Sequence, residues 1–291
     1  MNGEPNGHFV GTVRKEMESH LTDEESSTLA SMKTTGAPYL VFGADRLARP
    51  ERPVVPALAE ARLFAVVAML GARHLAYESE NSGLPIRHVQ PKHPNQVGSH
   101  GRVDLPLHTD MGYLRFPGEA DHPELAAAPD FLILSCISNP CHVGTRIVTL
   151  DEVQALLPRN HFKSLMKKEF QFESPDSVAP PRVSEPFPVI FDHVRYGLMM
   201  RWEKCAGLTQ EAKRAVSALT TLFDDPSLGR TVSLAPHETL VFNNRTIVHG
   251  RGPIPVTGAG TGDRHLVRLY AQRLSTEVCL ANEQNPHLQK G

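Results

Sequence analysis

The chain has 291 residues, of which 40% are hydrophobic and 21% charged, the composition of an ordinary globular protein with material for a sizeable core. Its formal net charge is −2 and it contains no basic block, so we expect no binding to nucleic acid or to an anionic membrane. The apolar stretches are far shorter than the roughly 18 residues of a membrane-spanning helix, and the polar N-terminus lacks the apolar core of a secretory signal. We therefore expect a cytoplasmic protein.

The four cysteines stand apart from one another, without a C-x-x-C pair. In a reducing cytosol this arrangement is typical of buried thiols rather than of disulfides or a zinc site.

The predicted elements begin with a polar stretch, residues 1–20, that we expect to be mobile. A helix is predicted over 24–33, and a proline-rich connection precedes a second helix over 58–70, which Gly71 ends as a C-cap. Strand-like segments dominate the rest, with helices predicted over 151–157, where Asp151 would be the N-cap, and over 209–223. The predicted strands are 74–78, 85–90, 131–138, 145–149, 187–191, 231–234, 239–242, 246–249 and 265–272.

Many short strands with a few helices outside them predict a mainly β fold with flanking α, in the form of a double-sheet β-barrel or jelly roll. We expect a single domain over 21–283, followed by a tail over 284–291. Two long stretches without regular structure, 92–102 and 172–186, are expected at the rim of the barrel as lids.

The strongest chemical signal is a His-x-Asp pair. On a strand the side-chain period is two, so His108 and Asp110 would point to one face. A distant histidine would complete a facial triad on a metal and leave three positions open for a chelating cosubstrate and dioxygen. The candidate is His249, which follows a strand, a turn and a second strand. A second pair, His122 and Glu124, encloses a proline in a loop-like stretch and is set aside.

Two arginines follow the distal histidine. Arg264 lies 15 residues after His249 (264 − 249), and on a strand it would share a face with Arg268. A buried carboxylate requires a paired cation, and the arginine fork makes a bidentate match. From the residues alone this face is either exposed to solvent or holds two anions.

Several segments together are similar to one known family: Gly98–Ser99, 107–110, 131–138 leading to Thr145, 242–251 and 262–268. They resemble the clavaminate synthase-like branch of the taurine dioxygenase superfamily of iron(II)/2-oxoglutarate-dependent oxygenases, which includes hydroxylases of free amino acids. The resemblance covers roughly 58–273. It implies a double-stranded β-helix (a cupin-like barrel) and the cofactor set iron(II), 2-oxoglutarate and dioxygen.

The resemblance also implies roles for particular residues. His108, Asp110 and His249 would be the iron ligands and the catalytic centre. Thr145 and Arg264 would bind the far carboxylate of 2-oxoglutarate.

For the substrate, Arg268 would bind the α-carboxylate and Ser99 would lie near the amino-acid head group. Relatives that act on guanidino substrates carry a carboxylate where this chain has Gly197, and Asp192 would be its substitute.

These features predict a hydroxylase that attacks an unactivated C–H bond of an amino acid or an amino-acid-derived small molecule, in secondary metabolism such as antibiotic biosynthesis. Desaturation or cyclisation by the same chemistry stays open, as do a carrier-protein-tethered substrate and the oligomeric state. A non-redox metal-dependent hydrolase or isomerase would need a zinc-bound water and a general base, and the paired arginines argue against it. The intact residue set argues against a non-catalytic binding protein.

Overall fold

The structure is a computed structural model that describes residues 5–34, 38–43, 55–92, 98, 100–116, 119, 126–256, 263–276, 280–281 and 284–290. Ser99, Cys279 and the His122–Glu124 pair lie outside the described residues.

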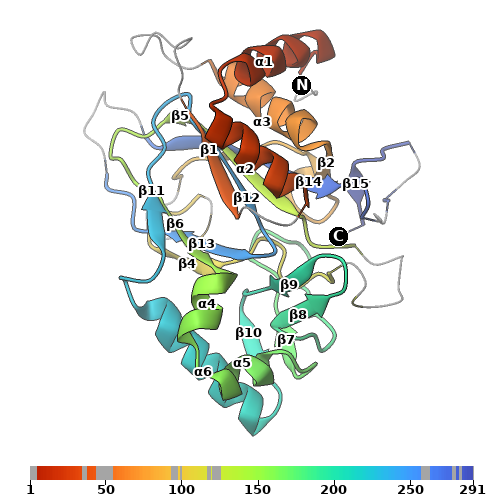
Figure 1. Cartoon of the computed structure of the whole chain (residues 1–291), viewed down its shortest axis with the longest axis vertical. Helices are drawn as coiled ribbons and strands as arrows, with labels where there is room; N and C mark the ends of the chain where they lie inside the picture. Colours follow the sequence, from red (N-terminus) through yellow and green to blue (C-terminus); the bar gives the residue numbers. More distant parts are fainter. Residues whose placement is uncertain are drawn as a thin grey trace.

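Two β-sheets form the centre of the molecule, with helices at both ends (Figure 1). The larger sheet has the order β1 (Tyr39–Phe42), β12 (Thr239–Asn243), β5 (Phe131–Ser138), β14 (His265–Arg273), β2 (Ala72–Tyr77) and β15 (Leu288–Gln289), and β3 (Arg87–Val89) also pairs with β14. The smaller sheet has the order β11 (Arg230–Val232), β6 (Thr145–Thr149), β13 (Ile247–Arg251) and β4 (Leu105–His108). Two two-stranded sheets complete the described strands: β7 (Phe170–Phe172) with β10 (Cys205–Gly207), and the hairpin of β8 (Ile190–His193) with β9 (Gly197–Met200).

Alternation along β5 explains how the larger sheet is covered on both faces. Leu132 and Leu134 belong to a core that also contains Ile147 of the smaller sheet. Ile133 points to the other face and joins a second core with Leu63 of α3 (Pro56–Leu70). Because successive strand residues face opposite ways, one continuous apolar strand serves both layers.

Helices cover the outer face of the larger sheet. The prediction for α3 is confirmed: Pro56 stands at its first turn, and it ends at Gly71, whose φ of 62° is left-handed. The predicted helix 24–33 is α2 (Asp23–Thr34). Within the segment predicted to be mobile the structure contains a further helix, α1 (Gly7–Ser19). Its only fully buried residue is Val13, but Val10 and Met17, at i−3 and i+4 from it, pack beside it against α3, a short apolar stripe that the sequence interpretation overlooked.

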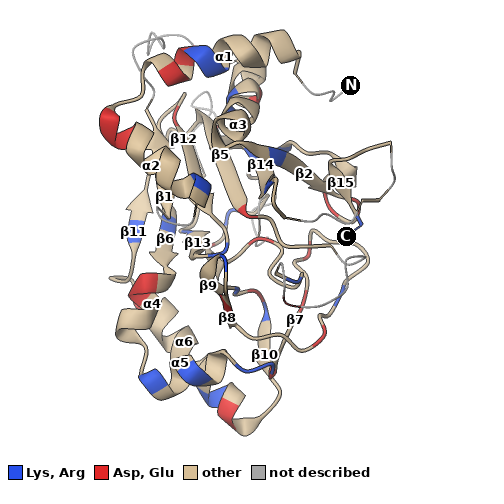
Figure 2. Cartoon of the chain, turned by 45° about the vertical axis from the view of Figure 1, so that its right-hand side comes forward, with Lys and Arg blue, Asp and Glu red and all other residues tan. Residues whose placement is uncertain are grey.

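The other end of the molecule carries α4 (Leu150–Leu156), α5 (Arg159–Leu165) and α6 (Gln210–Asp224), and Figure 2 shows charged residues on the helices at both ends. The predicted cap of α4 was wrong by two positions: Thr149 caps the helix and forms a reciprocal capping box with Glu152, because the preceding strand leads directly into it. α6 begins after its N-cap Thr209, as predicted.

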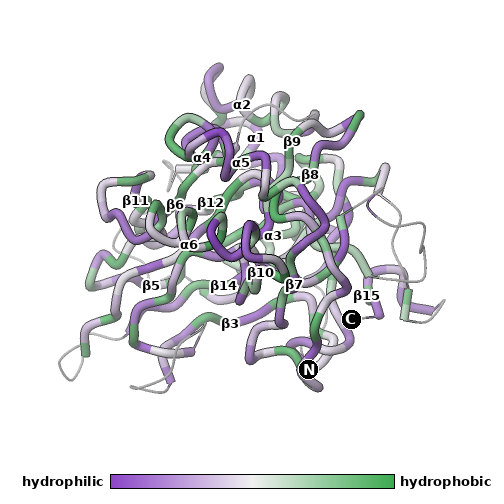
Figure 3. The backbone as a smooth tube through the Cα atoms, turned by 90° about the horizontal axis from the view of Figure 1, so that it is seen from below, coloured by the Kyte–Doolittle hydropathy of each residue, from purple (hydrophilic) through white to green (hydrophobic). Residues whose placement is uncertain are grey.

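The predicted strands are confirmed in position, two of them with the same bounds, β5 and β6. The sequence missed α5 and the short strands β1, β7, β9, β10 and β15, which have two to four residues each. Seen from below, β5, β14 and β3 run side by side (Figure 3), which brings three distant segments of the chain together. Within the described part of the chain, no helix has the length and apolarity needed to span a membrane.

Candidate metal centre

Strand register brings the two predicted histidine ligands together. β13 pairs with β4 so that His249 lies opposite His108, and the centroids of the two rings are 4.4 Å apart. The glycine after His249 is required by this approach, since a Cβ on Gly250 would lie 2.5 Å from the carbonyl oxygen of Leu105. Asp110 follows in the turn after β4, and the candidate ligand atoms of the three residues all lie within 4.8 Å of one another.

The protonation of these side chains suits a divalent metal. Nδ1 of His108 donates to the carbonyl oxygen of Pro106 at 2.9 Å, which leaves the Nε2 lone pair for a metal. Burial lowers the pKa of His108 to about 4, and the neighbouring His249 contributes, so the imidazole is neutral at pH 7. Burial alone would raise the pKa of Asp110, but the hydrogen bond from His249 and the charge of Arg268 hold it below its usual value. Two histidines with one carboxylate match the donor set of a non-haem iron(II) site.

Asp110 is fixed at both its side chain and its backbone. Its Oδ1 accepts a hydrogen bond from the Tyr270 hydroxyl at 2.9 Å and one from Arg268 at 3.3 Å, while Oδ2 lies 3.3 Å from Nε2 of His249. The side-chain amide of Asn244 accepts from the Asp110 backbone N–H and donates to the Asp110 carbonyl oxygen. Oδ2 is therefore the oxygen available to a metal. Sequence reasoning assigned no role to Asn244 or Tyr270.

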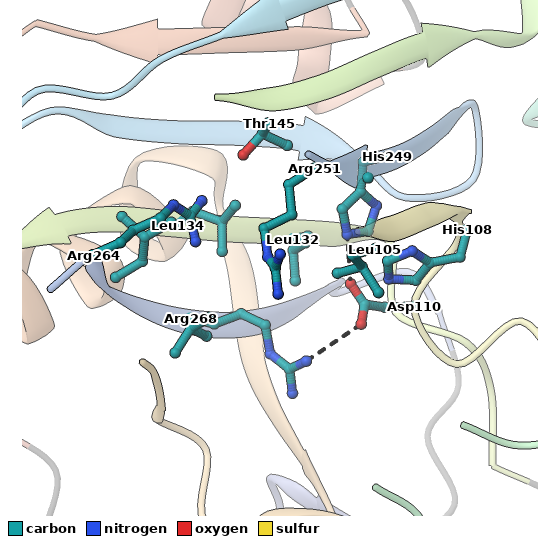
Figure 4. A pocket seen from close by; sticks show the side chains of 13 residues that line it. Leu105, His108, Asp110, Leu132, Leu134, Thr145, His249, Arg251, Arg264 and Arg268 are labelled. Atoms are coloured by element: carbon teal, nitrogen blue, oxygen red, sulfur yellow. Dashed lines mark hydrogen bonds and ion pairs between the residues drawn. The ribbon is translucent and has the colours of Figure 1, made fainter. Parts of the chain in front are cut away.

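A small cavity of about 60 Å³ opens on one side of the three candidate ligands (Figure 4). Thr145, at the start of β6, and Arg264, just before β14, both line it. Arg264 is 4% exposed, and its Nε makes a long hydrogen bond of 3.4 Å to the carbonyl oxygen of Val143. Among the described residues its two terminal nitrogens have no partner. Burial lowers the pKa of Arg264 to about 10, with a contribution from Arg251, so it stays cationic at pH 7 and suits a buried anion.

Arg251, two residues after His249, also lines the small cavity, but its guanidinium already donates hydrogen bonds to the protein backbone. Its guanidinium donates to the carbonyl oxygens of Gly98, Gly101 and Val103, so it holds the chain that leads into β4. We therefore assign Arg251 the role of positioning this backbone segment rather than of binding a ligand.

A larger cavity of about 600 Å³ adjoins the small one: Leu105, His108, Asp110 and Arg268 line both, whereas His249 lines only the small cavity. Its wall is completed mainly by residues outside the two large sheets: Gly98, His100, Pro175, Asp176, Ser177, Trp202, Glu203, Lys204 and Cys205. The predicted lid segment 172–186 thus contributes to the wall.

Glu203 is the unexpected residue in this wall. It is 8% exposed and has no hydrogen-bond or ion-pair partner among the described residues. Burial raises the pKa of the Glu203 carboxyl well above its usual range, and the charge of Asp110 adds to the effect.

Of the predicted substrate residues, the structure brings Arg268 to the site but not Asp192. Arg268 lines both cavities, and it is bound to both carboxylate oxygens of Glu80, at 2.8 and 2.9 Å, a partner that sequence reasoning missed. The sequence alternative that Arg264 and Arg268 face solvent is excluded, since they are 4% and 7% exposed. Asp192 is exposed in the β8–β9 hairpin and lines neither cavity, so the structure does not bring it to the site.

No known protein-family model matches the chain. Over 72 residues it is 42% identical to a uridine-5'-phosphate dioxygenase from an Amycolatopsis species, a stretch that covers 24% of this chain and 26% of that protein. The structure is similar to asparagine oxygenase in complex with Fe(II), (2S,3S)-3-hydroxyasparagine and succinate, with a TM-score of 0.70, 22% identity, and coverage of 93% of this chain and 85% of that chain. It is also similar to the non-heme iron oxygenase OrfP in complex with Fe and alpha-ketoglutaric acid, with a TM-score of 0.68, 21% identity, and coverage of 92% and 85%. The chain therefore has the fold of the non-haem iron oxygenases, in agreement with the resemblance seen in the sequence.

Proposed function

We propose that this chain is an iron(II)- and 2-oxoglutarate-dependent oxygenase that hydroxylates an amino acid or an amino-acid-derived small molecule. The observation that carries the proposal is the cluster of His108, Asp110 and His249, of which His108 and Asp110 line two adjoining cavities of different character. One cavity holds a buried arginine whose terminal nitrogens lack partners among the described residues, and the other is ten times larger (about 600 against 60 Å³). This arrangement suits a small chelating cosubstrate on one side and a separate substrate on the other.

When bound, iron(II), 2-oxoglutarate and dioxygen supply the oxidising chemistry, with succinate and carbon dioxide as coproducts. His108, Asp110 and His249 would hold the metal on one face and leave the opposite face to the reactants. Thr145 and Arg264 would bind the far carboxylate of 2-oxoglutarate in a site shielded from water. Shielding strengthens that ion pair and fixes the direction in which the cosubstrate reaches the metal.

The substrate would bind in the large cavity, with Arg268 at the boundary between the two. The asparagine oxygenase complex contains a hydroxylated asparagine, and an OrfP complex contains (3S)-hydroxy-L-Arg, which supports a free amino acid. The partial relative is a uridine-5'-phosphate dioxygenase, which supports a nucleoside monophosphate as a second candidate.

Several finer predictions belong with this proposal. The two facing sheets support a double-stranded β-helix, formed by one domain over 21–283. Hydroxylation is the expected outcome, with desaturation or cyclisation as the alternative. A carrier-tethered substrate and a place in antibiotic biosynthesis also remain predictions.

The test is succinate formation by anaerobically purified protein given iron(II), ascorbate and 2-oxoglutarate and then exposed to oxygen, with each of the free L-amino acids and with uridine 5'-phosphate. We expect one substrate to stimulate succinate formation and to gain one oxygen atom, detected by mass spectrometry. His108→Ala should abolish both signals. Failure of the wild-type protein to bind iron(II) and 2-oxoglutarate would contradict the proposal and would favour a zinc-dependent hydrolase or isomerase, which can be assayed without oxygen.

A further inference from the structure

Two buried arginines from adjacent strands meet in the wall of the large cavity. β3 and β14 are antiparallel, and their register places Arg87 opposite Arg268. Both residues line the large cavity, with Arg87 8% and Arg268 7% exposed. Like charges directly opposite each other on a sheet are destabilising, so this pair requires an explanation.

Glu80 supplies part of the explanation. Its carboxylate accepts from Arg87 at 2.7 Å and from Arg268 at 2.8 and 2.9 Å, and Glu80 itself does not line the cavity. Two guanidinium groups and one carboxylate leave a charge of +1 (2 − 1) in a buried position. Asp110 also forms an ion pair with Arg268 at 3.3 Å, and under the proposed function its charge would be shared with the metal.

Arg87 is incompletely satisfied. Its Nε is buried without a hydrogen-bond partner, and among the described residues Nη2 has none either. The other cation of the cavity wall, Lys204, is already paired with Asp176 at 2.5 Å. The unmatched positive charge of the large cavity therefore lies at the Arg87–Arg268 pair.

We propose that Arg87 is a second oxyanion-binding residue of the large cavity, which acts beside Arg268 on a carboxylate or phosphate group of the substrate. Two guanidinium groups with Glu80 behind them offer donors from two directions, so the anion completes a cluster that the protein leaves at +1. The inference rests on the proposed function, and it adds Arg87 as a residue that determines substrate specificity.

A buried Arg–Glu–Arg cluster can instead be purely structural. A structural cluster would leave the affinity for small anions unchanged when Arg87 is altered. An oxyanion site would lose affinity for small anions when the Arg87 guanidinium is removed. It would keep that affinity when a positive charge is removed elsewhere on the protein.

The experiment is a calorimetric titration of the full chain, loaded anaerobically with iron(II) and 2-oxoglutarate, with inorganic phosphate in one arm and acetate in the other. Trp202, the only tryptophan, lines the large cavity and gives an independent fluorescence signal. Arg87→Gln removes the charge, and Arg87→Lys keeps it but loses the fork. Arg195→Gln is the matched control, because it removes one positive charge from the exposed turn of the β8–β9 hairpin.

We expect Arg87→Gln to weaken anion binding by about 10- to 100-fold, Arg87→Lys to weaken it less, and Arg195→Gln to leave it unchanged. Tighter binding of phosphate would identify a phosphate monoester as the substrate group, and tighter binding of acetate would identify a carboxylate.

Unchanged affinity in both Arg87 variants would overturn the inference, as would a wild-type protein that binds iron(II) and 2-oxoglutarate but neither anion. If iron(II) and 2-oxoglutarate do not bind while phosphate still binds through Arg87, the proposed function fails and the oxyanion site stands. Arg87→Gln removes one partner of the buried Glu80 carboxylate and can thereby prevent folding. In that case the anion affinity of Arg87→Lys is the deciding measurement.

Discussion

The two cavities that share His108 and Asp110 are built differently. The small cavity is lined almost entirely by residues of strands, among them Thr145 of β6 and Leu134 of β5. The large cavity takes much of its wall from the irregular segments 175–177 and 202–205. Strands in register hold a site rigidly, whereas loops can vary without disturbing the sheets. We infer that the small cavity fixes the chemistry and the large one sets the substrate.

Two of the three candidate metal ligands, His108 and Asp110, line both cavities, so their loss should produce the largest effect and should not distinguish the two cavities. We expect His108→Ala to reduce iron(II) affinity and turnover by more than the roughly 100-fold that loss of an outer-shell partner costs. Iron content after anaerobic gel filtration and succinate formation measure the two quantities. A variant that keeps full activity would show that the metal lies elsewhere.

Arg264 tests the small cavity alone. Among the buried cations of the small cavity, it is the one whose terminal nitrogens lack partners among the described residues, so Arg264→Gln should lower the affinity for 2-oxoglutarate by about 10- to 100-fold, the range expected for a charged hydrogen bond. Phosphate and acetate should bind to the large cavity as before. Parallel titrations of 2-oxoglutarate and of the two anions provide the measurement. Equal losses in both would mean that the cavities are not independent.

Tyr270 lines neither cavity, but its hydroxyl donates to the Oδ1 of Asp110, which lines both. Tyr270→Phe keeps the ring and removes this hydrogen bond, so Asp110 would gain freedom to rotate. We expect iron(II) affinity to fall by about 10-fold, the lower end of the range for outer-shell partners. The unfolding midpoint should change little because the ring still fills its place. Unaltered iron(II) affinity would mean that Arg268 and Asn244 suffice to hold Asp110.

The difference between the cavities also explains what the sequence could and could not predict. The candidate metal residues and Arg264 were found from short motifs in or beside strands, a local property that the sequence carries, although the structure places Asp110 in the turn after β4 and Arg264 just before β14. Glu80 precedes the short 3-10 helix η1 (Asn81–Gly83), and Glu203 lies in a bend, so their burial depends on tertiary contacts that no local pattern records.

Two wrong or missed predictions have the same origin. Asp192 was inferred from its position in the sequence, but the β8–β9 hairpin leaves it exposed and away from both cavities. The pairing of Arg87 with Arg268 joins segments 181 residues apart (268 − 87), and only the sheet register reveals it.

The smallest expected effect lies on the opposite side of β14, away from both cavities. Nε2 of His265 lies 2.9 Å from Nδ1 of His88, whose other ring nitrogen is 3.3 Å from Glu60. Burial lowers the pKa of His265 to about 4, and the neighbouring His88 contributes. Between pH 6.5 and 4 the unfolded chain therefore binds more protons at this residue than the folded chain does, so the free energy of unfolding falls as the pH falls.

His265→Gln should remove this part of the pH dependence, which urea unfolding at pH 7, 5.5 and 4.5 would measure as a shallower slope than in the wild-type protein. His8→Gln, on the exposed face of α1, is the control and should keep the wild-type slope. The side chain of His265 points away from the face that carries Arg264 and Arg268, so 2-oxoglutarate and anion affinities at pH 7 should not change. If they do change, β14 transmits a disturbance from one face to the other, and the two cavities are coupled through the strand they share.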